Sequence, residues 1–165
     1  MRSRVAFAVA ATLALGTFPG HAATVVALGA SNTRGKGVAS GQAYPAQLEA
    51  ILRARGKKVS VVNAGINGDT TDHMLARMDH LISNDTKVVI LQPGGNDRRK
   101  GKTDEQSNVD AIRARLTARG IALVMLSNNM FRGKPHQPDG QHLTPEGYHQ
   151  LAEELTASVE GALGR

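Results

Sequence analysis

Short β-branched segments alternate with longer amphipathic segments after residue 23, and this alternation is the strongest constraint on the fold. Four apolar runs have the composition and length of strands: residues 24–28, 59–63, 87–91 and 121–126. Apolar residues recur at helical spacing in four further segments: residues 44–55, 71–83, 109–119 and 145–163. Strands that alternate with helices are joined by right-handed crossovers, which place helices on both faces of a parallel sheet. We therefore predict a three-layer α/β/α fold.

The first 23 residues differ from the rest of the chain. Arg2 and Arg4 precede an apolar run at residues 5–15, and small residues follow at 20–23. This pattern is typical of a secretory signal peptide. The apolar run is well short of the roughly 20 residues that span a bilayer, so we expect no stable membrane insertion. We predict a signal peptide at 1–23, one domain at 24–165 and a periplasmic or secreted location.

Composition narrows the classes of protein further. The absence of cysteine excludes a disulfide framework and a thiolate metal site, and the low aromatic content of 3% predicts an aliphatic core. Loss of the signal peptide would remove two of the 20 basic residues and none of the 14 acidic ones, leaving a net charge of +4. The only dense basic cluster lies at residues 98–102. It is either a nucleic-acid patch or a solvated loop; we favour the loop and expect no nucleic-acid partner.

Polar, glycine-rich loops follow the predicted strands. They occupy residues 29–35, 63–70, 94–97 and 139–142. Ligands of open parallel sheets bind outside the carboxyl ends of the strands, so these loops are expected to meet at one edge of the sheet. Together they contain a serine hydroxyl, an imidazole, a carboxylate, backbone amides and an asparagine side chain. Acyl transfer by a serine nucleophile requires these groups.

Three residues fit the roles of such a nucleophilic site. A serine hydroxyl is a weak nucleophile, so it needs an imidazole to accept its proton and a third group to fix the tautomer of that imidazole. We assign Ser31 as nucleophile, His142 as base and Asp139 as the orienting carboxylate. Asp139 precedes His142 by three residues, which one turn can bring together. Ser31 and Asp139 are also ordinary turn residues, so each has a purely structural alternative.

The oxyanion of a tetrahedral intermediate needs hydrogen-bond donors, and loss of one donor typically costs about 10²–10³ in rate. Our candidates are the N–H groups of Ser31 and Gly68 and the side-chain amide of Asn96. Gly65 is an alternative to Gly68. Glycine at either position lets the backbone approach a substrate closely.

Several neighbouring polar residues are expected to act in the fold. We interpret Asp97 as a capping or turn residue, and Asp69 and Thr70 as caps of the helix that follows, with Asp69 also bracing the oxyanion loop. Thr144 is the expected N-cap of the last helix, with Pro145 at its first position.

The motifs resemble those of the GDSL or SGNH hydrolases. Gly29-x-Ser31-x-Thr33-x-Gly35, Gly68-Asp69-Thr70, Gly94-Gly95-Asn96-Asp97 and Asp139-x-x-His142 occur in that order, and the segment AYPAQL at 43–48 resembles the arylesterase and lysophospholipase-like branch. The resemblance implies a flavodoxin-like SGNH fold and a carboxylic ester hydrolase. It implies the catalytic residues Ser31, Asp139 and His142, and the oxyanion donors Gly68 and Asn96.

Two features depart from the family pattern. Ala30 stands where the family usually has an aspartate, which removes a polar contact of the nucleophile loop. Only residues 127–137 separate the fourth strand from Pro138, where the family normally places a further helix and a fifth strand. We therefore expect a sheet of four to five strands and an open cleft.

The sequence predicts a serine esterase that acts through an acyl-serine intermediate. The resemblance implies aryl, short acyl or lysophospholipid esters as substrates, and extends to thioesters and acetylated sugars. The alternative is a non-catalytic carbohydrate- or lipid-binding module on the same fold. A nucleotide-binding loop is excluded, because five residues separate Gly29 from Gly35 where a phosphate-binding loop has four, and Lys36 is followed by glycine.

No cofactor or metal is expected. We predict surface or helix-face positions for the remaining histidines at 73, 80, 136 and 149, since no pair has the H-E-x-x-H spacing of a zinc site. Met130 and Phe131 are either an apolar wall of the acyl pocket or part of the core. The sequence leaves the oligomeric state open.

Overall fold

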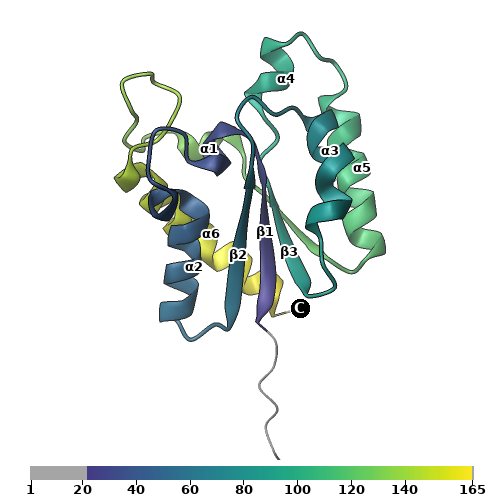
Figure 1. Ribbon diagram of the computed structural model, residues 1–165, viewed down its shortest axis with the longest axis vertical. Helices are drawn as coiled ribbons and strands as arrows, with labels where there is room; N and C mark the ends of the chain where they lie inside the picture. The colour runs from purple at the N-terminus through teal and green to yellow at the C-terminus, as the bar shows by residue number, and fades with distance from the viewer. Residues whose placement is uncertain (1–21, 165) are drawn as a thin grey trace, which may run out of the picture.

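The computed structural model describes residues 22–164, so residues 1–21 of the predicted signal peptide lie outside the described part. Its centre is a four-stranded parallel sheet in the order β2-β1-β3-β4 (Figure 1). The strands are β1 (Ala23–Gly29), β2 (Val59–Gly65), β3 (Thr86–Leu91) and β4 (Ala122–Met125). The parallel sheet predicted from the alternating segments is confirmed, in its four-stranded form.

Helices cover both faces of this sheet. The helices α2 (Tyr44–Ala54) and α6 (Pro145–Leu163) pack on one face, and α3 (Thr71–Leu81) and α5 (Glu105–Ala118) pack on the other (Figure 1). The predicted three layers are therefore present. Four short helical segments were not predicted: α1 (Ser31–Arg34), η1 (Ser40–Gln42), α4 (Gly95–Arg99) and η2 (Asn128–Phe131).

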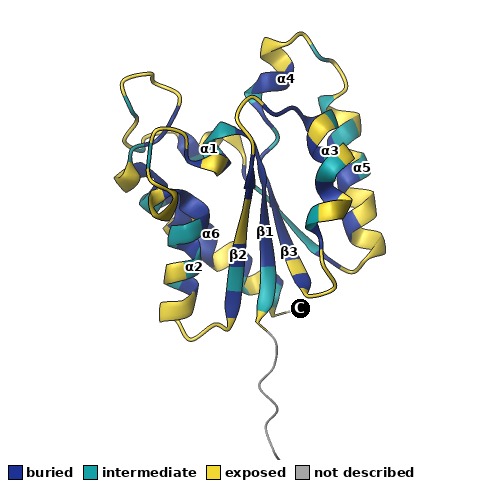
Figure 2. Cartoon of the chain, viewed as in Figure 1, coloured by how far each residue is buried: buried dark blue, intermediate teal, exposed yellow. Residues whose placement is uncertain are grey.

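The strand β1 lies at the centre of the core. Successive side chains of a strand point to opposite faces of the sheet. Val25 and Ala27 therefore pack with α2 and α6, while Val26 and Leu28 pack with the helices of the other face. All four are almost completely buried, as the dark blue of this strand in Figure 2 shows. A strand buried on both sides holds the residue that follows it in a fixed position.

The predicted boundaries differ from the observed ones mainly at the helices and at the edge strand. α5 begins at Glu105, four residues before the predicted start at 109, because its first turn is polar and carries no apolar signal. β4 covers 122–125 of the predicted 121–126, and its residues are only half-buried because it is an edge strand that pairs with β3 alone. α6 has its predicted bounds, and Thr144 caps it by accepting a hydrogen bond from the Gly147 N–H at 3.2 Å.

Candidate active site

Ser31, His142 and Asp139 form a chain of hydrogen bonds at the carboxyl end of the sheet. Ser31 is the first residue of α1 and follows β1 by one residue. Its Oγ lies 2.9 Å from His142 Nε2, and His142 Nδ1 lies 2.5 Å from Asp139 Oδ2. A carboxylate can only accept, so Nδ1 carries the proton and Nε2 is left to accept from the serine hydroxyl. The structure thus brings the three predicted residues together in the predicted order.

The turn before His142 keeps Asp139 ionised and aligned. Asp139 Oδ1 accepts hydrogen bonds from the backbone N–H groups of Gln141 at 2.9 Å and His142 at 3.0 Å. The side-chain hydrogen bond of His142, together with these two backbone donors, holds the pKa of Asp139 well below its usual range. The imidazole of His142 is buried, whereas Asp139 is exposed. The carboxylate is therefore fixed by hydrogen bonds and not by packing.

A hairpin of backbone contacts carries Asp139 and His142. His136 and Leu143 form an isolated antiparallel bridge, and the N–H of Gln137 donates to the carbonyl of His142 at 2.7 Å. The side-chain amide of Gln137 donates to the carbonyls of Leu143 at 2.7 Å and Lys36 at 2.8 Å. Because Lys36 follows α1, Gln137 ties the hairpin to the loop beside the nucleophile.

Asn32 makes a second connection between the nucleophile and the hairpin. Its Nδ2 donates to the carbonyl of Gln141 at 3.2 Å, and its Oδ1 accepts from the Tyr148 hydroxyl at 3.0 Å. Burial raises the pKa of Tyr148 to about 12, so this phenol remains a donor at neutral pH. α1, the hairpin and α6 are therefore joined through one asparagine.

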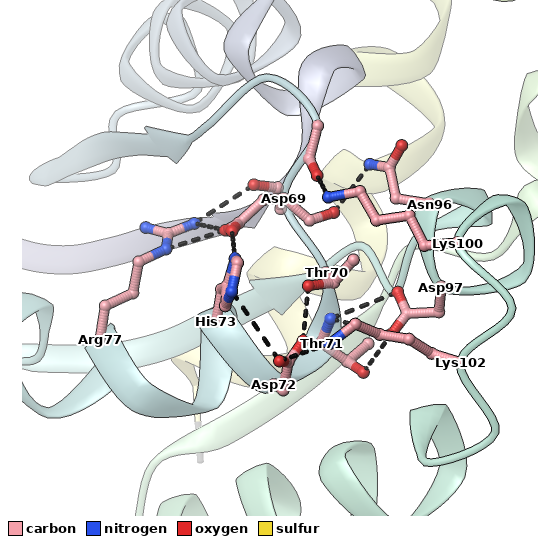
Figure 3. Close-up of polar contacts among 12 residues, drawn as sticks. Asp69, Thr70, Thr71, Asp72, His73, Arg77, Asn96, Asp97, Lys100 and Lys102 are labelled. Carbon is pink, nitrogen blue, oxygen red and sulfur yellow. Dashed lines mark hydrogen bonds and ion pairs between the residues drawn. The ribbon is translucent and has the colours of Figure 1, made fainter.

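Asn96 enters the same cleft from the end of β3. Its amide is buried, and its Nδ2 donates to the carbonyl of Asp69 at 2.7 Å (Figure 3). Its Oδ1 accepts from Arg99 Nη2 at 2.5 Å. These two contacts fix which end of the amide is nitrogen. Nδ2 carries two hydrogens, so one remains for a ligand.

The two candidate glycines have different surroundings. The N–H of Gly65 donates to Asn63 Oδ1 at 3.0 Å, and a Cβ at Gly65 would lie only 2.1 Å from the backbone nitrogen of Arg34. Gly65 is therefore required for close packing of β2 against α1. Gly68 is exposed at φ +76°, and its carbonyl accepts from Lys100 Nζ at 2.9 Å. Within residues 22–164, the N–H groups of Ser31 and Gly68 donate to no protein acceptor. Gly68 is not among the residues that line the cleft.

Thr70 is the N-cap residue of α3, as predicted, but neither its side chain nor that of Asp69 makes a capping hydrogen bond. Thr70 donates its hydroxyl to Asp72 Oδ1 at 2.5 Å, and the capping hydrogen bond is accepted by Asp97 of the next motif. Asp97 Oδ1 accepts from the N–H of Thr71 at 3.1 Å and from its hydroxyl at 2.7 Å (Figure 3). Asp97 is completely buried. It is thus a capping residue, as predicted, but for a helix that lies earlier in the sequence.

These groups surround a cleft of about 240 Å³. Ser31, Asn96 and His142 line it, together with Phe131, which also belongs to the core on the α2 and α6 face. Met130 packs against that core and is not a lining residue. His136, predicted at the surface, is exposed but also lines the cleft.

The basic cluster at 98–102 is exposed at residues 98–101, as predicted, but it is a loop only after Arg99. Arg98 and Arg99 belong to α4 and line the cleft, and Lys100 binds the Gly68 carbonyl. Lys102 pairs with Asp72 at 2.6 Å, and hydrogen bonds from Lys102 and Thr70 hold the pKa of Asp72 well below its usual range.

Comparison with known proteins identifies the family of the chain. A sequence model of the GDSL-like lipase/acylhydrolase family matches residues 27–162. The chain belongs to this family. Esterase TesA of Pseudomonas aeruginosa is 31% identical over 117 residues, which cover 69% of this chain and 58% of that protein. Thioesterase 1/protease 1/lysophospholipase L1 of Escherichia coli K12 is 37% identical over 97 residues, covering 58% and 45%. The chain spans about half the length of the curated relatives it matches.

Solved structures of esterases share the fold of this GDSL-like family member. The psychrotrophic esterase EstA from Pseudoalteromonas sp. superposes with a TM-score of 0.75 at 18% identity, covering 86% of this chain and 99% of that one. AlinE4, an SGNH-hydrolase family esterase, superposes with a TM-score of 0.60 at 27% identity, covering 82% and 73%. These similarities confirm the fold and the family expected from the motifs.

In this family member the nucleophile loop is braced by Arg77, which the sequence analysis missed. Ala30 is buried among apolar residues and gives the loop no polar contact. Arg77 Nη2 donates to the carbonyls of Gly29 at 3.3 Å and Ala64 at 2.7 Å, and also binds Asp69 Oδ2 at 2.7 Å (Figure 3). Asp69 therefore holds Arg77 against the nucleophile loop, whereas the sequence predicted that it braces the oxyanion loop. Arg77 lies eight residues after Asp69, beyond the three- or four-residue spacing at which helical side chains meet, and Asp69 precedes α3, so no local pattern identifies this pair.

Two further findings concern the described residues as a whole. Within residues 22–164, no three His, Cys, Asp or Glu side chains are grouped as they would be around a metal ion. In the same part of the chain, every helix is too short or too polar to cross a membrane.

Proposed function

We propose that the chain is a serine hydrolase of carboxylic esters that acts through an acyl-Ser31 intermediate. The observation that carries this proposal is the continuous hydrogen-bonded chain from Ser31 through His142 to Asp139, in a cleft that Asn96 also lines. The names of the relatives, which include an esterase, a thioesterase and lysophospholipase, and an arylesterase, support an ester or thioester bond as the target.

In the acylation step, Ser31 Oγ attacks the acyl carbon while His142 Nε2 accepts the hydroxyl proton. The ionised Asp139 stabilises the resulting imidazolium. The tetrahedral intermediate collapses when His142 returns this proton to the leaving oxygen, and the alcohol departs. A water molecule, deprotonated by His142, then attacks the acyl-serine, and acid and free enzyme result.

Three donors are proposed for the oxyanion: the N–H groups of Ser31 and Gly68 and the remaining hydrogen of Asn96 Nδ2. The first and third lie at the cleft. The Ser31 N–H donates to no protein acceptor within residues 22–164, and Asn96 Nδ2 uses only one of its two hydrogens, on the Asp69 carbonyl. Gly68 completes the set if its exposed loop closes over a bound substrate. The contact between Asn96 Nδ2 and the Asp69 carbonyl connects this loop to the asparagine.

We propose the same substrate range as the sequence predicts: aryl, short acyl or lysophospholipid esters, with thioesters as a second class. The cleft favours short acyl groups, because Phe131 is the only large apolar side chain among its lining residues in the described part of the chain. The proposed location is periplasmic or secreted, on the basis of the N-terminal pattern.

The decisive measurement is hydrolysis of p-nitrophenyl acetate and butyrate by the purified protein. Ser31→Ala and His142→Ala are each expected to lower kcat/KM by about 10⁴-fold or more, since the two residues act as one unit. Ser158→Ala, an exposed serine on α6, is the matched control and should have wild-type activity. Circular dichroism would establish that each variant is folded.

A non-catalytic binding module makes the opposite prediction. Its wild-type protein would hydrolyse these esters no faster than the Ser31→Ala variant, and an organophosphonate would leave Ser31 unmodified. Mass spectrometry after phosphonate treatment therefore separates the two functions. A single adduct that is absent from Ser31→Ala supports the hydrolase.

A further inference from the structure

Two arginines at the cleft are not required by the proposed reaction. Arg98 and Arg99 are consecutive residues of α4, and both are exposed while lining the cleft with Ser31. A Cβ built on Gly95 would lie 3.4 Å from Nη1 of Arg99 and 3.7 Å from Nη2 of Arg98. The two guanidinium groups therefore converge over the same glycine, which leaves room for them.

These two positive charges have no compensating carboxylate. Within residues 22–164, neither guanidinium lies within 4.0 Å of an acidic side chain, and the lining residues of the cleft include no Asp or Glu. The nearest acidic residues of the site are engaged elsewhere: Asp69 with Arg77, Asp97 with Thr71, and Asp139 with His142. Two adjacent guanidinium groups without a carboxylate partner repel each other and are well suited to bind a planar anion through paired hydrogen bonds.

The position of this pair indicates which part of a substrate it meets. Figure 1 shows α4 above the α3 and α5 side of the sheet, whereas the segment that leads into α6 and carries His142 lies on the α2 side. His142 must deliver a proton to the leaving oxygen, so the alcohol part of an ester lies on its side. Asn96 of α4 is the proposed donor to the carbonyl oxygen, so the acyl part, on the side away from His142, lies beside the arginines of the same helix.

We propose that Arg98 and Arg99 form a subsite for a carboxylate on the acyl part of the substrate, so that half-esters of short dicarboxylic acids are preferred over neutral esters. This inference rests on the proposed esterase function and specifies its substrate class. Within residues 22–164 the side chain of Arg98 makes no hydrogen bond or ion pair, and Arg98 is the dedicated recognition residue. Arg99 has a second task, because its Nη2 orients Asn96.

The test compares two matched pairs of esters with the purified protein. Monoethyl glutarate and ethyl pentanoate differ only in a carboxylate on the acyl part, while 3-acetoxypropanoate and propyl acetate differ in a carboxylate on the alcohol part. We expect kcat/KM to be higher for monoethyl glutarate than for ethyl pentanoate, and this ratio to fall with added NaCl. A preference for the anion on the alcohol part, or none in either pair, would overturn the proposal.

The variants assign the effect to the arginines. Arg98→Gln is expected to lower the ratio between monoethyl glutarate and ethyl pentanoate by about three- to tenfold, the range for a charged hydrogen bond in an open site. Arg113→Gln removes the same charge from an exposed position on α5 and should leave the ratio unchanged. An equal change in both variants would mean that only net charge matters, which contradicts a subsite.

A binding measurement separates failure of this inference from failure of the proposed function. Calorimetric titration of glutarate into the protein needs no turnover. Weaker binding to Arg98→Gln than to Arg113→Gln supports the subsite even if none of the esters is hydrolysed, an outcome that would contradict only the esterase. Equal binding to the two variants contradicts the subsite.

Discussion

The two walls of the cleft are held by different kinds of contact. On the hairpin side, Asp139 is exposed and is fixed by hydrogen bonds to the turn that contains it. On the α3 and α4 side, Asp69 and Asp97 are buried and are bound by side chains from α3. Buried charges left without partners are costly, whereas exposed ones remain solvated. We therefore expect substitutions in the hairpin to affect chemistry and substitutions in the other wall to affect stability.

The largest effect is expected at Asp139. Asp139→Asn keeps the size of the side chain but favours the wrong imidazole tautomer of His142, so kcat/KM should fall by about 10³- to 10⁴-fold. Its urea unfolding midpoint should remain close to that of the wild type. Asp79→Asn, at an exposed carboxylate of α3, is the control and should change neither quantity. A large loss of stability in Asp139→Asn would contradict the expectation that substitutions in the hairpin affect chemistry and not stability.

The next effect is expected at Arg77. Arg77→Met removes the partner of a buried carboxylate at Asp69, and we expect the free energy of unfolding to fall by about 3 kcal/mol. Arg115→Met breaks the exposed ion pair with Asp79 and should cost less than about 1 kcal/mol. Chemical denaturation of the two variants provides the comparison. Equal losses would show that burial of the Asp69 carboxylate is not the cause.

A smaller loss is expected at Asp97. Asp97→Ala leaves the N–H and hydroxyl of Thr71 without an acceptor, which should lower the free energy of unfolding by about 2 kcal/mol. Asp97→Asn retains one acceptor oxygen, so its loss should be about half as large. The ratio of the two losses, measured by urea denaturation, sharpens the assignment of Asp97 as a cap. If both variants are as stable as the wild type, the cap is supplied by another group.

The smallest effect is expected at Tyr148. Tyr148→Phe preserves the buried ring and removes only the hydrogen bond to Asn32, which should cost about 1 kcal/mol. Asn32 also binds the hairpin that carries His142. We therefore expect a small decrease in kcat and a smaller relative change in KM. Tyr44→Phe, on the other buried tyrosine, is the control for loss of a phenol that contacts Thr33 and not Asn32. Equal kinetic effects in both variants would contradict a positioning role for Asn32.

Local patterns in the sequence were sufficient to predict the layers of the fold and the three residues of the hydrogen-bonded chain. Continuous apolar, β-branched runs predicted β1 and β3, and the spacing of Asp139 and His142 predicted the turn that joins those two residues. The contacts that the sequence did not reveal connect distant segments. Asp97 caps a helix 26 residues earlier, and Arg77 reaches the ends of two strands. No local periodicity encodes such pairs, since each depends on the order of strands in the sheet.

The side-chain amide of Gln137 joins the hairpin that carries His142 to the loop after α1. It is one of few contacts between the hairpin and the loop after α1, and it is partly exposed to water. Segments with few buried contacts open at a lower free energy than the core strands. Brief detachment of the hairpin would carry His142 away from Ser31 while the sheet stays folded. Heating should therefore abolish activity reversibly at a temperature below that at which the sheet unfolds. Cooling should restore the activity without refolding of the sheet.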